Sequence, residues 1–233
     1  MLSTDRYARQ TALPEIGPSG QARLAKARGL LVGVGGLGSP IALYLAAAGI
    51  GTLGLVDDDT VSVSNLQRQV LYTEAEVGQP KALCAARRLR SLNSETDIRP
   101  YAERLTPQNA EQLIADYDIV VDGCDNFATR YLVNDTCLRL GKPYVYGAIR
   151  GFEGQVSVFG HGQQARSYRD LYPDEEAMLR LTPDKSVIGV TAALVGATEA
   201  GEVLKLVCGY GESLAGKLWT IDLRTLQSYI LTL

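Results

Sequence analysis

A glycine-rich segment, Gly33-Val34-Gly35-Gly36-Leu37-Gly38, constrains the fold more than any other feature of this chain. The apolar run at 30–34 predicts a buried strand and residues 36–48 predict a helix, so the glycines fall on a strand-to-helix turn. Backbone N–H groups at such a turn, together with the positive end of the helix dipole, favour an anion. Gly33, Gly35, Gly36 and Gly38 therefore predict where the phosphates of a nucleotide bind.

An acidic residue, Asp57, follows the next predicted strand at 52–56. A carboxylate at that strand end can accept hydrogen bonds from both hydroxyls of a ribose. Asp58 and Asp59 belong to the turn that follows, where Asp59 can assist. Because enzymes of nicotinamide and of adenine nucleotides share this ribose contact, both classes stay open at this point.

A polar segment, Ser64-Asn65-Leu66-Gln67-Arg68-Gln69, comes next. A cation and two amides suit a triphosphate, because they can grip it and neutralise charge that moves between phosphates. Asn65, Gln67 and Arg68 are the predicted contacts, and Lys81 would point its charge at the same region from the start of the next helix. The alternative is a solvated loop with one surface arginine.

A second polar group, Asp122-Gly123-Cys124-Asp125-Asn126, ends the predicted buried strand at 119–121. Ligands of open parallel sheets gather at the carboxyl ends of strands, which places Asp125 and Asn126 at the nucleotide. Asp125 can hold Mg²⁺, since this ion takes one or two carboxylates together with substrate oxygens and water. Either residue can also cap the helix that begins here. The flanking carboxylates argue against Cys124 as a nucleophile.

The alternation of strands and helices predicts a doubly wound, Rossmann-like α/β fold with a mainly parallel sheet. A strand at 155–159 follows its predecessor too closely for a helical crossover and is expected to be antiparallel. Residues 160–185 are polar and lack periodicity, which predicts a mobile surface loop. The remaining predicted elements are helices at 80–92, 108–116, 126–140 and 187–207, and strands at 97–102, 143–148, 217–222 and 225–231. We expect one domain over 1–233, with a nucleotide-binding part at about 29–150 and an antiparallel part at about 151–233.

Composition excludes several function classes. A formal net charge of −3 gives no electrostatic case for nucleic acid, and no apolar run approaches the ~20 residues of a membrane span. The first residues lack the apolar region of a signal peptide, so a cytoplasmic location is expected. The chain has one histidine and four widely spaced cysteines without a C-x-x-C pair. It therefore offers few candidate zinc ligands and little basis for a Ser-His-Asp triad.

Together these motifs resemble those of the ThiF/MoeB/HesA family, relatives of the ubiquitin-activating enzymes. The similarity covers nearly the whole chain. The matching segments are R-Y-x-R-Q at 6–10, G-x-G-G-L-G-S at 33–39, G-x-x-x-L-x-D-x-D at 51–59, S-N-L-Q-R-Q at 64–69, V-G-x-P-K at 77–81, D-x-x-D-N at 122–126 and G-Q-V-S-V-F at 154–159.

The resemblance implies a homodimeric enzyme that binds ATP and Mg²⁺. Such an enzyme adenylates the C-terminal Gly-Gly carboxylate of a ubiquitin-like sulfur carrier protein and releases pyrophosphate, for thiamine or molybdopterin biosynthesis. The resemblance places Gly36 under the phosphates, Asp57 on the ribose, magnesium at Asp125 and Asn126 beside the nucleotide. It also implies nucleotide contacts by Ser64, Asn65, Gln67, Arg68 and Lys81. Arg9 is implied to reach the site of the partner subunit. The implied catalytic residues are Arg9, Arg68, Lys81 and Asp125.

Two departures from the family pattern affect the expected chemistry. Ser167-Tyr168-Arg169-Asp170 stands where relatives carry a first zinc C-x-x-C pair, and predicts no zinc. Thr182 stands where relatives place a reactive cysteine, so we expect adenylation alone, with sulfur delivered by another protein. Two rival functions stay open. One is an NAD(P)-dependent oxidoreductase, which lacks an evident acid or base here, and the other is a non-catalytic nucleotide-binding adaptor.

Overall fold

A computed structural model describes residues 6–163, 165–182, 184 and 186–233. Its strands form one eight-stranded sheet in the order β3-β2-β1-β4-β5-β6-β7-β8. The first five strands in this order pair in parallel, and β6, β7 and β8 are antiparallel. This confirms the predicted fold class. The strands are β1 (Arg28–Val32), β2 (Thr52–Val56), β3 (Asp97–Tyr101), β4 (Ile119–Asp122), β5 (Tyr144–Arg150), β6 (Glu153–Phe159), β7 (Lys217–Asp222) and β8 (Gln227–Thr232).

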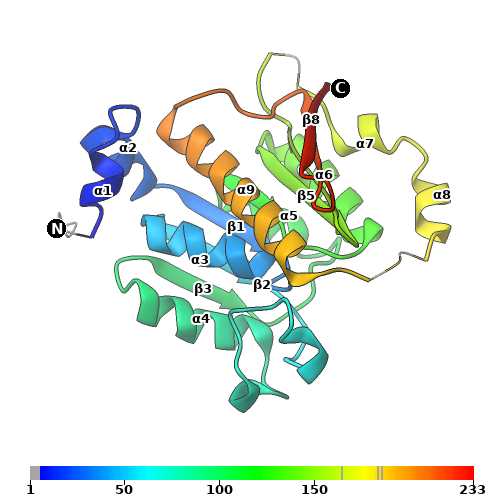
Figure 1. Cartoon of the computed structure of the whole chain (residues 1–233), viewed down its shortest axis with the longest axis horizontal. Coiled ribbons are helices and arrows are strands. Elements are labelled where there is room, and N and C mark those ends of the chain that lie inside the picture. Colours follow the sequence, from blue (N-terminus) through cyan, green and yellow to red (C-terminus); the bar gives the residue numbers. More distant parts are fainter. Residues whose placement is uncertain (1–5, 164, 183, 185) are drawn as a thin grey trace.

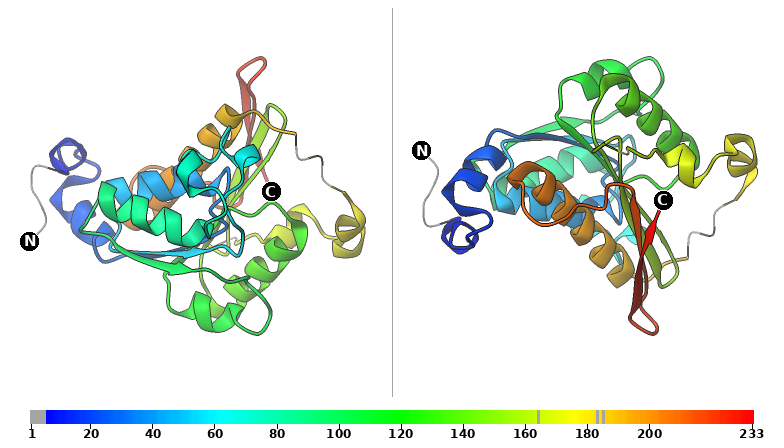
Figure 2. Two further views of the ribbon diagram at one scale, coloured as in Figure 1. Left: turned by 90° about the horizontal axis from the view of Figure 1, so that it is seen from below. Right: turned by 90° about the horizontal axis from the view of Figure 1, so that it is seen from above.

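Helices cover both faces of the sheet (Figure 1, Figure 2). One face carries α2 (Gly17–Leu24), α3 (Gly38–Ala48), α4 (Lys81–Leu92) and α9 (Gly189–Cys208). The other carries α5 (Ala110–Ala115), α6 (Phe127–Leu140) and α7 (Tyr168–Leu171). The shorter α1 (Ala8–Thr11) packs against α2, and α8 (Glu175–Arg180) against α6. Two 3-10 turns, η1 (Val63–Asn65) and η2 (Glu74–Glu76), lie between β2 and α4.

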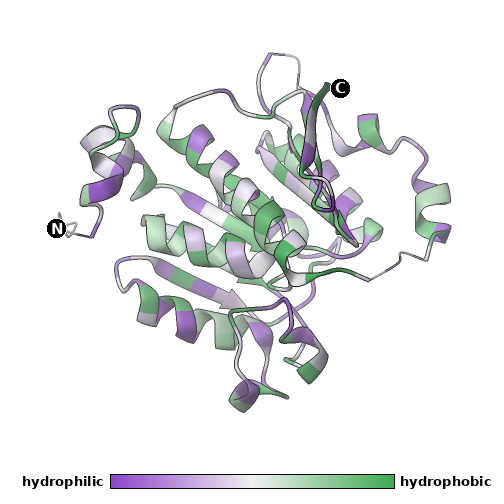
Figure 3. Ribbon diagram, in the orientation of Figure 1, coloured by the Kyte–Doolittle hydropathy of each residue, from purple (hydrophilic) through white to green (hydrophobic). Residues whose placement is uncertain are grey.

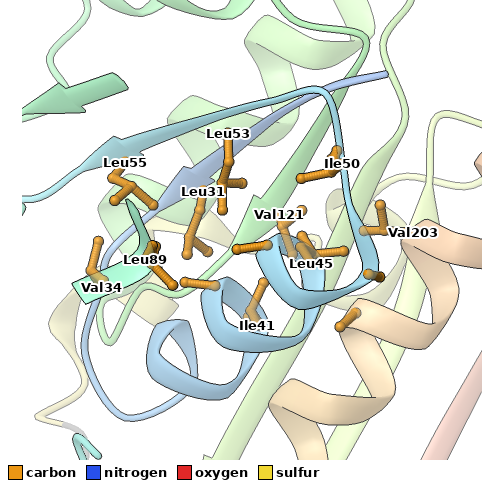
Figure 4. Close-up of a cluster of buried hydrophobic side chains, with 14 of the residues drawn as sticks. Leu31, Val34, Ile41, Leu45, Ile50, Leu53, Leu55, Leu89, Val121 and Val203 are labelled. Carbon is orange, nitrogen blue, oxygen red and sulfur yellow. The ribbon is translucent and has the colours of Figure 1, made fainter. Parts of the chain in front are cut away.

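The larger hydrophobic core lies between the parallel strands and α3 (Figure 4). Leu31, Leu53 and Val121 project from neighbouring strands onto Ile41 and Leu45 of α3, and all five are fully buried. Burial of each such side chain contributes about 1.5–3 kcal/mol. The inner strands β1, β2 and β4 are largely apolar because both of their faces are covered. This core fixes the strand ends that carry the site.

The predicted elements agree with the structure in most places. β2 begins and ends at the predicted residues, and β6 pairs antiparallel with β5 as expected. The short helices α1 and α2 were not predicted. In the described part of the chain, no helix combines the length and the apolar character that a membrane crossing would need.

The prediction of a surface loop over the whole of 160–185 was wrong, because this segment contains α7 and α8. Two capping residues start these helices: Asp170 accepts from the backbone N–H of Ser167 at 2.6 Å, and Asp174 accepts from that of Ala177 at 2.9 Å. Tyr168 anchors α7 in the core. Residues 164, 183 and 185 of the predicted loop lie outside the described residues.

Candidate active site

A cleft of about 1230 Å³ opens at the carboxyl ends of β1, β2 and β4 and continues over the antiparallel strands. It brings together the glycine turn, the residues after β2 and the residues after β4, which are far apart in the sequence. Ten of the predicted site residues line it: Gly33, Gly35, Gly36, Asp57, Asp59, Asn65, Arg68, Lys81, Asp125 and Asn126.

The glycine turn depends on the absence of side chains. Gly33 has φ +89°, and a Cβ there would lie 2.5 Å from the carbonyl oxygen of Gly123. A Cβ on Gly38 would lie 2.2 Å from the carbonyl oxygen of Gly33. Gly38 therefore allows α3 to start close behind the turn, and it does not line the cleft itself. The Tyr72 hydroxyl donates to the carbonyl of Val34 at 2.7 Å, and this hydrogen bond stabilises the turn.

Asp57 lies at the end of β2 beside the turn. Its carboxylate accepts the backbone N–H of Val34 at 2.7 Å and that of Asp59 at 2.9 Å, one on each oxygen. Burial raises the pKa of Asp57 above its ordinary value, and the two N–H donors partly offset the rise. Each carboxylate oxygen keeps acceptor capacity for a hydroxyl group.

The side chain of Asp59 contacts Lys81, while its backbone N–H donates to Asp57. The Lys81 ammonium is 2.9 Å from the Asp59 carboxylate, with the lysine buried and the aspartate exposed. The pair therefore holds a buried cation at the wall of the cleft. Asp59 has the geometry to orient Lys81.

Arg68 crosses over the glycine turn. A Cβ on Gly36 would lie 3.3 Å from Arg68 Cδ and 3.5 Å from Ala192 Cβ, so the arginine stem packs above that glycine. Its guanidinium donates to the carbonyl of Ser64 at 3.1 Å. Asn65 caps η1 by accepting the backbone N–H of Ser62 at 3.1 Å. The polar segment thus presents a cation directly over the turn.

Asp125 and Asn126, which follow β4, have different roles. Asn126 caps α6 by accepting the backbone N–H of Thr129 at 2.9 Å. Asp125 is exposed and lines the cleft. Burial, and next the charge of Asp122, raise the pKa of the Cys124 thiol well above its ordinary value, which agrees with the expectation that it is not a nucleophile.

The donor set of the cleft fits magnesium better than a transition metal. Across the described ranges, no three His, Cys, Asp or Glu side chains are close enough together to hold a metal ion. A single carboxylate at Asp125 still suits Mg²⁺, which takes its other ligands from phosphate oxygens and water.

Besides Gly38, three predicted residues do not line the cleft. Ser64 and Gln67 are exposed, and the Gln67 amide lies 3.5 Å from the carbonyl of Val187. Arg9 is exposed on α1, at the end of the molecule near the N-terminus (Figure 1). The neighbouring Tyr7 packs beside Gly49, where α3 ends. Arg9 is therefore distant from the glycine turn of its own chain.

Several lining residues were not predicted. Arg130 is buried in α6, and Gln69 is buried beside Gly35. Tyr146, Gln155 and Tyr172 continue the cleft toward the antiparallel strands, where the Gln155 amide donates to both tyrosine hydroxyls at 2.6 and 2.9 Å. A charged residue on an otherwise buried helix face was the available signal for Arg130.

The sheet order and the helices on both faces define an α/β protein with the E1-like fold. The crystal structure of E. coli MccB with ATP superimposes with a TM-score of 0.87 at 24% identity, covering 100% of this chain and 72% of that one. This chain belongs to the ThiF family, whose sequence model matches residues 7–232. The family prediction is confirmed.

Proteins with named activities are similar over most of this chain. The sulfur carrier protein adenylyltransferase of Thermus thermophilus is 49% identical over 94% of this chain and 83% of its own length. The adenylyltransferase and sulfurtransferase MOCS3 of Sus scrofa is 49% identical over 93% of this chain, and the probable adenylyltransferase/sulfurtransferase MoeZ of Mycobacterium tuberculosis is 46% identical over 93%. This chain spans only 48% and 57% of the latter two.

Proposed function

We propose that this protein is an ATP-dependent adenylyltransferase that activates the C-terminal Gly-Gly carboxylate of a ubiquitin-like sulfur carrier protein. The supporting observation is the cleft, which gathers Asp57, Arg68, Lys81 and Asp125 around the glycine turn. The relatives named adenylyltransferases support the same reaction. The pathway served, thiamine or molybdopterin biosynthesis, stays open.

In the proposed complex, ATP lies along the cleft with its phosphates at the glycine turn. The ribose hydroxyls donate to Asp57, and Arg68 and Lys81 contact the phosphate chain. Apolar surface from Val56, Leu105 and Phe127 lines the cleft and suits a purine ring. Asn126 borders the nucleotide.

In the proposed reaction, a carboxylate oxygen of the carrier attacks the α-phosphorus of ATP. The bond from that phosphorus to the bridging oxygen breaks, and pyrophosphate leaves with the bond's electron pair. A carboxylate is a weak nucleophile toward an anionic phosphate, so alignment and nearby cations supply most of the rate. Mg²⁺ held by Asp125 would neutralise charge on the phosphates.

The antiparallel part, at about 151–233, is the proposed docking surface for the carrier. The cleft continues past Gln155 to Arg150, Asp222 and Tyr229. Every residue of the edge strand β8 is exposed, so its outer backbone groups can pair with an extended segment. The β7–β8 hairpin projects beyond the rest of the sheet (Figure 2).

We propose that the sulfur donor lies outside these 233 residues. All four cysteines, Cys84, Cys124, Cys137 and Cys208, are unpaired and buried. Burial raises the pKa of each thiol, for Cys137 to about 12. None of them can present a thiolate to an acyl-adenylate. Four unpaired thiols also fit the proposed cytoplasmic location.

A second copy of this chain is the proposed occupant of the face formed by α3 and α9, which lie side by side (Figure 1). Tyr44 on α3 is 58% exposed and Val190 on α9 is 61% exposed. Further along α9, a Cβ on Gly201 would meet no atom within 4 Å. In Figure 3 the ribbons of both helices are largely pale or green, so few of their residues are strongly hydrophilic. We propose that Arg9 acts in the cleft of this second copy.

Exchange of labelled pyrophosphate into ATP tests the proposed function. Exchange should require both a carrier protein ending in Gly-Gly and Mg²⁺. Asp125→Ala should reduce the exchange rate by roughly 100-fold, the effect of one lost transition-state contact. Asp116→Ala, an exposed carboxylate outside the cleft, is the matched control. Tight binding of a nicotinamide dinucleotide without exchange would instead favour an oxidoreductase.

Mixed dimers test the proposed role of Arg9. Arg9→Ala and Asp125→Ala should each be inactive alone. Mixing the two proteins should restore roughly a quarter of the wild-type rate, because random pairing makes half of the dimers mixed and each has one intact site. No recovery on mixing would mean that Arg9 does not act across an interface.

A further inference from the structure

Arg130 is a buried cation beside the cleft that the proposed reaction leaves without a role. It lies in the first turns of α6, and its side chain is 9% exposed. Nε donates to the Asp122 carboxylate at 2.9 Å, and Nη2 donates to the backbone carbonyls of Cys124 at 2.9 Å and Gly147 at 3.0 Å. One guanidinium thus joins the end of β4, the loop after it and the middle of β5.

The two carbonyls stand at functionally different places. Cys124 directly precedes Asp125, the proposed magnesium ligand. Gly147 directly precedes Ala148, which lines the cleft where it turns toward the proposed carrier-docking strands. The guanidinium therefore joins the loop that carries Asp125 to the strand that carries Ala148.

The partner carboxylate is itself held rigidly. Asp122 is 1% exposed and also accepts the backbone N–H of Cys124 at 2.7 Å and the hydroxyl of Tyr144 at 2.8 Å. Burial alone would lower the pKa of Arg130, but the charge of Asp122 and the nearby tyrosines raise it above its ordinary value. The ion pair is thus fully formed inside the protein.

A buried ion pair by itself says little about stability, because desolvation of both charges offsets their attraction. The geometry is more informative. A planar guanidinium can donate to a carboxylate and to two carbonyls at fixed angles, whereas a lysine ammonium cannot reproduce that fork. The arrangement suits the precise spacing of two backbone segments.

We propose that Arg130 is a positioning residue that fixes the spacing between the Asp125 loop and the acceptor side of the cleft. The acceptor side is the part formed by β5 to β8, where the carrier is proposed to dock. The inference rests on the proposed function of this cleft. Reacting atoms must be held about 3–3.5 Å apart, and a misplacement of about 1 Å can cost roughly 100-fold in rate.

Arg130→Lys tests the inference while it keeps a positive charge opposite Asp122. Calorimetry would measure the affinity for a non-hydrolysable ATP analogue with and without Mg²⁺. We expect little change without the metal, because the glycine turn and Asp57 are intact. The gain in affinity on adding Mg²⁺ should fall by about tenfold, as for other residues that orient a metal ligand. The maximal rate of carrier-dependent exchange should fall by roughly 100-fold.

A control and a milder variant guard against misfolding. Arg139→Lys changes an exposed arginine of the same helix and should leave all three measurements unchanged. Tyr144→Phe removes only the hydroxyl that donates to the Asp122 carboxylate. It should reduce the magnesium-linked gain and the exchange rate by about threefold, a smaller effect than that of Arg130→Lys because it acts on Arg130 only through Asp122. If Arg130→Lys does not fold, the magnesium-linked gain and the exchange rate of Tyr144→Phe test the positioning role instead.

Two results separate this inference from the proposed function. Wild-type protein that shows no carrier-dependent exchange would contradict the proposed function, whatever Arg130 does. If the wild type exchanges and both variants lower the melting temperature yet keep the wild-type magnesium-linked gain and rate per folded molecule, Arg130 is only structural and the inference is overturned.

Discussion

The two sides of the cleft are built on opposite principles. On the nucleotide side, backbone segments touch without intervening side chains: a Cβ on Gly123 would lie 2.0 Å from the carbonyl of Gly33. On the acceptor side, β8 is exposed along its whole length, and a Cβ on Gly151, between β5 and β6, would meet no atom within 4 Å. The proposed nucleotide is the same small molecule in every catalytic cycle, so a rigid site can bind it. Docking of the proposed carrier protein instead needs accessible surface.

The largest difference between the two sides is expected when a methyl group is added to each. Gly33→Ala places a side chain at φ +89° and against the Gly123 carbonyl, and should lower the free energy of unfolding by about 3 kcal/mol through strain and overpacking. Gly151→Ala meets only its positive φ of +57° and should cost about 1 kcal/mol. Denaturant unfolding of both variants measures the difference, and equal losses would refute the contrast.

The next largest effect is expected from the titration of Glu199, which lies where the two sides of the cleft meet. Glu199 of α9 lies behind Gly147, fully buried, and neither carboxylate oxygen has a hydrogen-bond partner among the described residues. Burial, and next the charge of Asp122, raise the pKa of Glu199 well above its ordinary value, although Arg130 opposes the rise. The native state therefore holds this proton more tightly than the unfolded state.

Stability must consequently fall as the pH rises above the pKa of Glu199 in the unfolded chain. The slope from this group is at most about 1.4 kcal/mol per pH unit, and it ends at the raised native pKa. Glu199→Gln should remove that decline, so the difference in unfolding free energy between variant and wild type should grow in favour of the variant from about pH 4 toward neutral pH. Parallel pH profiles for the two proteins would show that Glu199 does not titrate in this way.

The smallest effect on stability is expected on the acceptor side. Tyr229 of β8 is 58% exposed, so Tyr229→Ala should change the free energy of unfolding by no more than about 0.5 kcal/mol. The same change should raise the KM for the carrier roughly tenfold, as for an aromatic contact in an interface, and leave the KM for ATP unchanged. An increase in the KM for ATP instead would mean that the two sides are not separate.

The nucleotide side was also the more predictable one. The Gly33–Gly38 segment and the carboxylates after β2 and β4 follow from local sequence, because strand ends in a parallel sheet converge at one edge. β2 could be placed to the residue for the same reason, since an apolar run bounded by polar residues defines it.

Contacts between distant segments could not be read from the sequence. Arg130 matters because of the carbonyl of Gly147, seventeen residues away on another element. The helices α7 and α8 have no apolar periodicity, and capping pairs such as Ser167 with Asp170 define their start. The proposed action of Arg9 needs a second copy of the chain, which no single sequence displays.

Burial of all four thiols also makes this protein convenient to handle. Maleimide or iodoacetamide should react with no thiol of the native fold, so the enzyme could be treated with either reagent and should still activate the proposed carrier. Any sulfur transfer that such treatment abolishes in a reconstituted mixture would then be assignable to the donor, without a cysteine-free variant.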